Sequence, residues 1–158
     1  MAKAIIVTGT SKGIGKELCE RYLQEGYLVA GCARSQSKIA HENYRHFSLD
    51  VSNEIAVVAM IREVKREFGG VDALINNAGI ASMNHFLTTP FDSVKKVFET
   101  NFFGTFLFSR EVGKVMMKQK SGRIVNYTTV ASALRLEGEA IYAASKSAIE
   151  NLTQTLSK

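Results

Sequence analysis

The chain has 158 residues, of which 46% are hydrophobic and 22% are charged, as in an ordinary soluble globular protein. The formal net charge of +5 comes from scattered basic residues without interleaved aromatic side chains, which argues against a nucleic-acid partner. The longest apolar run, residues 55–61, is too short to span a membrane. The length predicts a single domain over residues 1–158.

The cysteines and the start of the chain favour a reducing compartment. Cys19 and Cys32 are isolated in apolar surroundings and are interpreted as buried, reduced thiols. The histidines lack an accompanying cysteine or carboxylate pattern, so no metal site is predicted. The apolar residues 4–7 run directly into a glycine loop, so no signal peptide is visible. These features predict a cytoplasmic location.

Apolar runs and amphipathic segments alternate along the chain. The runs predict strands over residues 3–7, 27–33, 44–49, 71–75 and 123–128. Helical spacing of apolar residues predicts helices that end near 24, run from 52 to 68, run from 90 to about 118, and begin at 141 and continue to 158.

Three residues mark expected helix ends. Gly26 is suited to the left-handed conformation that stops a helix. Ser52 is the expected N-cap of the second helix, and Pro90 is expected at the first position of the third.

Strands separated by helices predict a parallel sheet with right-handed crossovers. The expected fold class is α/β, a Rossmann-type doubly wound parallel sheet with strand order 3-2-1-4-5. Ligands of such sheets bind at the carboxyl ends of the strands. The polar motifs of this chain all fall at a strand's carboxyl end or on the helix that follows.

A glycine loop follows the first predicted strand. Gly9, Gly13 and Gly15 would let the backbone approach a pyrophosphate, which the N-terminus of the next helix would also attract. A purely structural turn is the alternative interpretation. A P-loop is excluded because Thr10 occupies its first glycine position and Glu17 replaces its serine or threonine.

The spacing of this loop resembles that of the short-chain dehydrogenase/reductase family. Further matches follow in the family's order, and together they cover the whole chain: Asp50-Val51, Asn76-Asn77-Ala78-Gly79, Asn101, Thr129 and Tyr142-Ala-Ala-Ser-Lys146. The resemblance implies a nicotinamide cofactor held by Gly9, Ser11, Lys12, Gly13, Ile14, Gly15, Arg34, Asp50, Val51, Asn77, Ala78, Gly79, Tyr142 and Lys146.

Charge at the end of the second strand favours NADP(H) over NAD(H). NAD-specific relatives carry an acid there, which bonds the ribose hydroxyls and repels a 2′-phosphate. This chain has Ala33 followed by Arg34, and Lys12 stands in the glycine loop. Two cations without a carboxylate fit the phosphate of NADPH.

Tyr142 and Lys146 are four residues apart and therefore share one helical face. A neighbouring ammonium stabilises a phenolate, which suits a tyrosine to acid–base work near neutrality. The resemblance implies that Tyr142 gives its proton to a carbonyl oxygen while the cofactor delivers hydride to the carbon. It also implies that Lys146 holds the nicotinamide ribose.

Two further positions complete the implied catalytic group. The family's usual serine is replaced by Thr129, which keeps the hydroxyl but adds a methyl group, and Ser132 is a fallback candidate. Asn101 lies on an apolar helix stripe, where an amide is costly unless it is hydrogen-bonded. It is either a helix-kink residue with satisfied bonds or, as the resemblance implies, a water-holding member of a proton relay.

Family members continue past the helix that begins near residue 141, so the chain is expected to lack the last strands of the family fold. Its fifth strand would then be an open sheet edge carrying Ile124 and Val125. Two functions remain: an NADPH-dependent reductase of a 3-oxoacyl thioester or another ketone, and a nucleotide-binding remnant without turnover. The substrate cannot be chosen from these residues.

The third helix carries more apolar residues than one core face needs. Phe102, Phe103, Phe106 and Phe108 point to several sides of it. Because the family pairs this helix with a second subunit, a homo-oligomer, either dimer or tetramer, is expected. Core packing is the alternative explanation.

Overall fold

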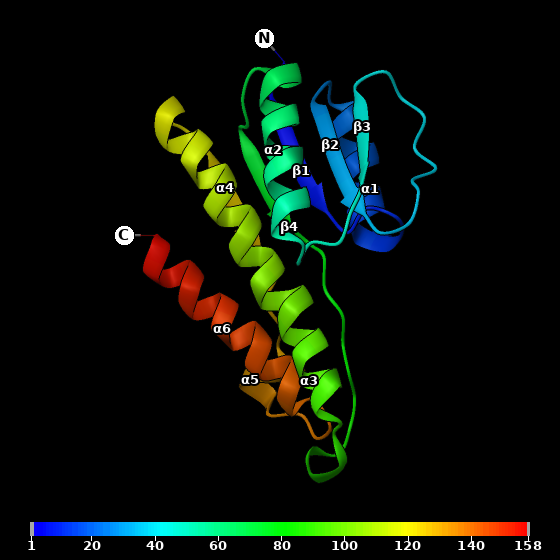
Figure 1. Ribbon diagram of the computed structural model, residues 1–158, viewed down its shortest axis with the longest axis vertical. Coiled ribbons are helices and arrows are strands. Elements are labelled where there is room, and N and C mark those ends of the chain that lie inside the picture. The colour runs from blue at the N-terminus through cyan, green and yellow to red at the C-terminus, as the bar shows by residue number, and fades with distance from the viewer. Residues whose placement is uncertain (1, 158) are drawn as a thin grey trace.

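Five short segments form one parallel sheet in the computed structural model, which describes residues 2–157 (Figure 1). The strands are β1 (Ala4–Thr8), β2 (Leu28–Ala33), β3 (Tyr44–Ser48), β4 (Ala73–Asn76) and β5 (Arg123–Asn126). Their order is β3-β2-β1-β4-β5, and every neighbouring pair is parallel. The structure therefore confirms the predicted fold class and strand order.

Helices lie on both faces of this sheet. They are α1 (Gly13–Gln24), α2 (Glu54–Phe68), α3 (Phe91–Phe98), α4 (Gly104–Gln119), α5 (Ala131–Leu134) and α6 (Ala140–Leu156), with a 3₁₀ turn at Phe86–Thr88 and a π-helical segment at Glu99–Phe103. In Figure 1, α2 and α4 cross one face of the sheet and α1 lies behind the other, while α6 packs beside α3 and the π-helical segment.

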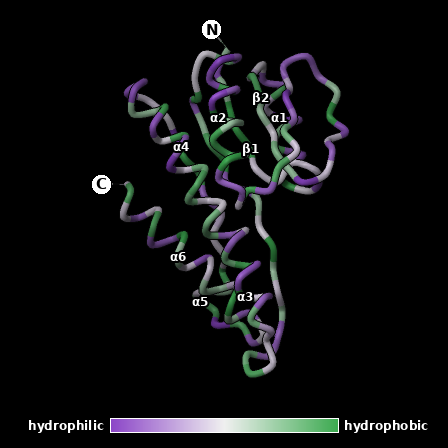
Figure 2. Tube along the Cα trace, viewed as in Figure 1, coloured by the Kyte–Doolittle hydropathy of each residue, from purple (hydrophilic) through white to green (hydrophobic). Residues whose placement is uncertain are grey.

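Strand β1 shows why the central strands are apolar throughout. Ile6 points into the core that α2 and α4 cover, whereas Ile5 and Val7 point into the core beneath α1. Successive side chains of a strand alternate between faces, so a strand covered on both sides has no polar face. Figure 2 shows this strand as a hydrophobic segment between the helices.

The N-cap of α2 differs from the prediction by one residue. Asn53 is the N-cap, and its Oδ1 accepts a hydrogen bond from Ala56 N at 3.1 Å. Ser52 instead uses its hydroxyl to donate to Asp50 Oδ1 at 2.7 Å. A serine and an asparagine can both cap a helix, but the Ser52 hydroxyl is already bonded to Asp50, two residues before it.

The long helix predicted from residue 90 is correct in extent but not uniform. Pro90 is the N-cap rather than the first helical residue, and its carbonyl accepts from the backbone N–H groups of Ser93 and Val94. The π-helical segment separates α3 from α4, and such a single-turn irregularity often marks a functional position.

The C-terminal elements lie close to their predicted bounds. Strand β5 ends at Asn126, two residues early. Helix α6 ends at Leu156 with Ser157 as its C-cap, so the predicted continuation is one residue too long there, while Lys158 lies outside the described residues. Strand β5 is a sheet edge, as predicted, and Val125 is 49% exposed. Ile124, however, packs against the core beneath α4.

Residues 2–157 contain neither a membrane-spanning helix nor a cluster of metal ligands. Over this range no helix combines the length and apolar character that crossing a bilayer needs. Within the same range, no three His, Cys, Asp or Glu side chains gather as metal ligands would.

Candidate active site

The glycine loop at the start of α1 folds tightly, and at two of its positions a side chain would be strained or would clash with the backbone. Gly9 has φ of +75°, the left-handed region that other residues avoid. A Cβ on Gly15 would lie 2.2 Å from the Gly9 carbonyl oxygen, so no side chain fits there. The first turn of α1 holds no acidic residue, which leaves the positive end of the helix available to an anion.

The segment after β4 is bonded directly to this loop. Asn77 Nδ2 donates to the carbonyl oxygens of Thr8 at 3.0 Å and Gly9 at 3.2 Å. In return, Thr8 Oγ1 accepts from the backbone N–H groups of Asn77 and Ala78. The carboxyl ends of β1 and β4 are therefore held in one unit.

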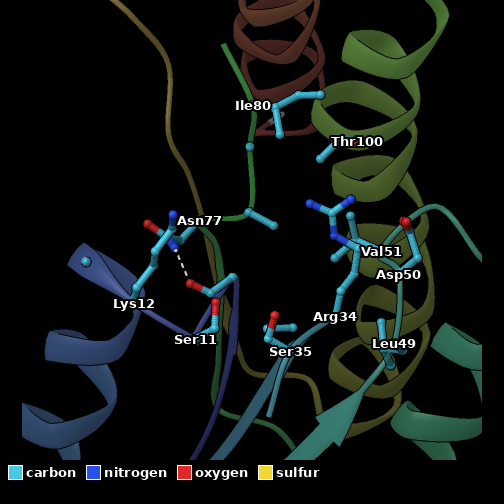
Figure 3. A pocket seen from close by; sticks show the side chains of 15 residues that line it. Ser11, Lys12, Arg34, Ser35, Leu49, Asp50, Val51, Asn77, Ile80 and Thr100 are labelled. Atoms are coloured by element: carbon cyan, nitrogen blue, oxygen red, sulfur yellow. Dashed lines mark hydrogen bonds between the residues drawn. The ribbon is translucent and has the colours of Figure 1, made fainter. Parts of the chain in front are cut away.

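A cavity of about 580 Å³ opens at the carboxyl ends of the strands (Figure 3). It includes most of the predicted cofactor residues: Gly9, Ser11, Lys12, Gly13, Arg34, Asp50, Val51, Asn77, Ala78 and Gly79. The predicted residues Ile14, Gly15, Tyr142 and Lys146 do not line it; Ile14 is 58% exposed and Gly15 is buried. The cavity is of the size that small-molecule sites occupy.

Cations stand at two sides of this cavity. In the view of Figure 3, Lys12 lies at the start of α1 and Arg34 stands on the opposite side, near Asp50 and Val51. Burial alone would raise the pKa of Asp50, but hydrogen bonds from Ser52 and the charge of Arg34 hold it below its ordinary value. Asp50 is therefore ionised at neutral pH.

Lys146 is buried, with 5% of its surface exposed, and its Nζ donates to the Tyr127 carbonyl oxygen at 2.8 Å. Burial lowers its pKa from the ordinary value, because the charged form loses hydration. A Cβ on Gly79 would lie 3.6 Å from Lys146 Nζ and 3.4 Å from Asn101 Oδ1. Gly79 lines the cavity, so two of the predicted catalytic residues lie directly behind the cavity wall at this point.

Asn101 is fully buried within the π-helical segment, and its amide is satisfied by protein groups. Its Oδ1 accepts from Ile80 N at 2.8 Å, and its Nδ2 donates to Ile80 O and to Ser145 Oγ, each at 3.0 Å. These bonds agree with the interpretation as a helix-kink residue. The role in a proton relay stays a prediction.

The other predicted catalytic residues lie after β5 and in the first turns of α6, outside the cavity lining. Tyr142 is half-buried in the first turns of α6, on the same face as Lys146. Thr129 Oγ1 accepts from Ala131 N at 3.2 Å, which fixes the turn before α5. The fallback candidate Ser132 donates to the Ala143 carbonyl oxygen at 3.3 Å.

Several residues of the site were not predicted from the sequence. Ser35, Leu49, Ile80 and Thr100 also line the cavity. Ser35 and Ile80 directly follow predicted residues at strand ends, and this adjacency could have identified them. Ser145 is buried and joins Asn101 to the Tyr142 carbonyl oxygen, but a serine inside a helix carries no such signal.

A family model described as short chain dehydrogenase matches residues 3–158. The chain belongs to this family. The 3-oxoacyl-(acyl-carrier-protein) reductase FabG of Vibrio cholerae is 34% identical over 162 residues, which are 99% of this chain and 66% of that protein. The FabG protein of Staphylococcus epidermidis is also 34% identical, over 100% of this chain and 69% of its own length.

Two solved structures, the first described as a short-chain dehydrogenase, agree closely with this fold. One from Streptomyces avermitilis has a TM-score of 0.93 and 30% sequence identity, covering 99% of this chain and 60% of its own. ElxO, solved with NADP bound, has a TM-score of 0.91 and 30% identity, covering 96% of this chain and 65% of its own. This short-chain dehydrogenase chain therefore spans about two thirds of the length of the relatives that it matches.

Proposed function

We propose that this chain provides the cofactor site and the acid–base group of an NADPH-dependent reductase that converts a carbonyl to an alcohol. The observation that carries the proposal is the cavity at the carboxyl ends of the strands, where the glycine loop, the free helix end and Arg34 face one space. Backbone N–H groups at a helix N-terminus suit a pyrophosphate. The arginine suits the 2′-phosphate that distinguishes NADPH from NADH.

Three features support the choice of cofactor. The residue at the end of β2 is Ala33 rather than an acid, so no carboxylate at that position repels a phosphate. Arg34 and Lys12 are exposed and have no ion-pair partner among residues 2–157. ElxO, which resembles this chain in fold and sequence, is described with NADP bound.

The proposed chemistry divides the work between cofactor and protein. When bound, NADPH would supply the hydride that reduces the carbonyl carbon. The Tyr142 hydroxyl would give its proton to the carbonyl oxygen, and Lys146 would orient the cofactor's ribose from its buried position. The names of the relatives suggest a 3-oxoacyl thioester as the substrate class, with other ketones as alternatives.

A fluorescence titration of the 158-residue chain with NADPH and NADH tests the cofactor proposal. We expect selective NADPH binding that Arg34→Ala weakens by ~10–100-fold, because a hydrogen bond to a charged group contributes roughly 1.5–3 kcal/mol. NADH binding should change little. Arg66→Ala removes another exposed arginine, on α2, and serves as the matched control. Equal affinity for both cofactors, unchanged by Arg34→Ala, would contradict the NADPH assignment.

The alternative function, nucleotide binding without turnover, is separated by a second measurement. NADPH oxidation that depends on an added ketone or 3-oxoacyl thioester would exclude it. NADPH binding without any such oxidation would favour it.

A homo-oligomer and a cytoplasmic location are also part of this proposal. Phe103, the last residue of the π-helical segment, and Phe106 on α4 are 48% and 39% exposed, which leaves apolar surface on this part of the long helix. Light scattering tests the assembly, and a monomeric mass would contradict it.

A further inference from the structure

A chain of polar groups links the glycine loop to the segment that follows β2. The Tyr44 hydroxyl is hydrogen-bonded to Thr10 Oγ1 at 3.3 Å and to His46 Nδ1 at 3.2 Å. His46 Nε2 lies 3.0 Å from the Ser35 carbonyl oxygen. Because a carbonyl oxygen can only accept a hydrogen bond, His46 Nε2 is the protonated ring nitrogen and donates a hydrogen bond to the Ser35 oxygen.

The core is shaped to hold the Tyr44 hydroxyl in this place. Tyr44 is 6% exposed and Thr10 is fully buried. Gly31 lies beneath them in β2, where a Cβ would be 2.3 Å from Tyr44 Oη and 2.8 Å from Thr10 Oγ1. Glycine weakens a strand interior, so its presence here marks the close approach of another group. Burial raises the pKa of Tyr44, which keeps the hydroxyl protonated.

Strand β3 holds three successive carbonyl groups at the end of β2. Leu49 N donates to the Ala33 oxygen at 3.1 Å, and Ser48 Oγ donates to the Arg34 oxygen at 3.1 Å. His46 holds the third, that of Ser35. Residues 34–43 connect β2 to β3 without a helix. These three hydrogen bonds therefore limit the motion of the backbone at residues 33–35.

We propose that Tyr44 and His46 are positioning residues that hold Arg34 and Ser35 at the distance from the glycine loop that the adenosine end of NADPH requires. Both Arg34 and Ser35 line the cavity, whereas Tyr44 and His46 do not. Loss of the link would free the Ser35 carbonyl group and loosen the segment directly after Arg34. The Arg34 guanidinium would then bind the 2′-phosphate less well. NADH, which lacks that phosphate, would be little affected. The inference rests on the proposed binding of NADPH.

The test compares His46→Leu, which removes the donor to Ser35, with His46→Gln, which can replace it. The control is His41→Leu, the same change on the same connection, at a ring that accepts from Asn43 N. Dissociation constants for NADPH and NADH are measured by fluorescence titration. Hydrogen–deuterium exchange of residues 34–36 is followed without cofactor.

We expect His46→Leu to weaken NADPH binding by about 5–20-fold, with NADH within about twofold, and to speed exchange at residues 34–36. His46→Gln should recover most of the affinity, and His41→Leu should match the unsubstituted chain. If His46→Leu fails to fold, Tyr44→Phe removes a single oxygen from the same link and gives the same comparison.

Two outcomes would overturn the inference, and they differ in what else they imply. NADPH affinity and exchange unchanged in His46→Leu, alongside lost selectivity in Arg34→Ala, would remove the positioning role but leave the proposed function intact. An unsubstituted chain that binds neither cofactor would overturn both.

Discussion

Asn101 and Ile80 form a two-way hydrogen-bonded pair between the π-helical segment and the loop after β4. The Asn101 amide accepts from Ile80 N and donates to Ile80 O, at 2.8 and 3.0 Å. The Asn101 side chain thus bonds both backbone groups of Ile80, as a neighbouring strand would in a sheet. Ile80 lines the cavity, and Asn101 also donates to Ser145 on α6. Asn101 therefore connects the wall of the candidate cofactor site to α6.

Substituting Asn101 by Ala should lower the free energy of unfolding by ~2–4 kcal/mol. The change removes the side-chain partners of the partly buried Ile80 N–H and C=O and one of the two hydrogen bonds of the buried Ser145 hydroxyl. Each partly buried group left without a partner costs roughly 1–3 kcal/mol. Denaturant unfolding measures the effect. Asn84→Ala is the control, because Asn84 is exposed and bonds Ser82 at the surface. A loss below about 1 kcal/mol in Asn101→Ala would contradict the structural role of this network.

Replacing Tyr142 by Phe should abolish ketone-dependent NADPH oxidation while NADPH affinity stays within about threefold. The phenyl ring keeps its volume but loses the proton donor, and general acid catalysis commonly contributes ~10²–10⁴-fold. Steady-state kinetics and a binding titration on the same sample separate the two effects. Tyr22→Phe, on α1 beside Tyr27, should leave both unchanged. Preserved turnover in Tyr142→Phe would remove this residue from the proposed chemistry.

Two glycine substitutions should have opposite signs. Gly15→Ala would place a Cβ 2.2 Å from the Gly9 backbone oxygen, so we expect a loss of several °C in Tm and of NADPH binding. Gly113→Ala lies inside α4, where a Cβ meets nothing within 4 Å. It should raise stability by ~0.5–1 kcal/mol, because alanine favours a helix. Thermal melts of both variants decide the matter, and equal effects would refute the close packing of the loop.

Lys146→Met should stabilise the fold near neutral pH by about 1 kcal/mol or more, since a buried ammonium is costly. Burial lowers the Lys146 pKa below its ordinary 10.5, so between the two values the unfolded chain holds a proton that the folded chain has lost. Stability from this group therefore rises with pH through that window. The advantage of Lys146→Met should shrink as the pH approaches about 10.

Thermal melts from pH 7 to pH 10 follow this difference. An advantage that grows with pH would show that the sign of the Lys146 shift is wrong. The same variant should lose turnover, since the proposed ribose contact is removed.

The sequence alone was sufficient for the features that local physics controls. Apolar runs separated by amphipathic segments predicted the parallel sheet, because burial on both faces leaves a strand no polar side. The glycines of the loop after β1 were singled out because a tight turn that lets the backbone approach a pyrophosphate needs residues without a Cβ, and Gly9 has a φ of +75°. The ordered motifs identified the short-chain dehydrogenase family, which the family model confirms over residues 3–158.

The tertiary structure decided which polar groups meet. Asn101 bonds Ser145, which is 44 positions away, and Tyr44 bonds Thr10, which is 34 positions away. Neither pair leaves a periodic signal, because hydrogen-bond partners across a fold depend on how the elements pack rather than on spacing. The effects of local sterics and burial can thus be predicted from the sequence. Which distant polar groups pair depends on how the helices pack on the sheet.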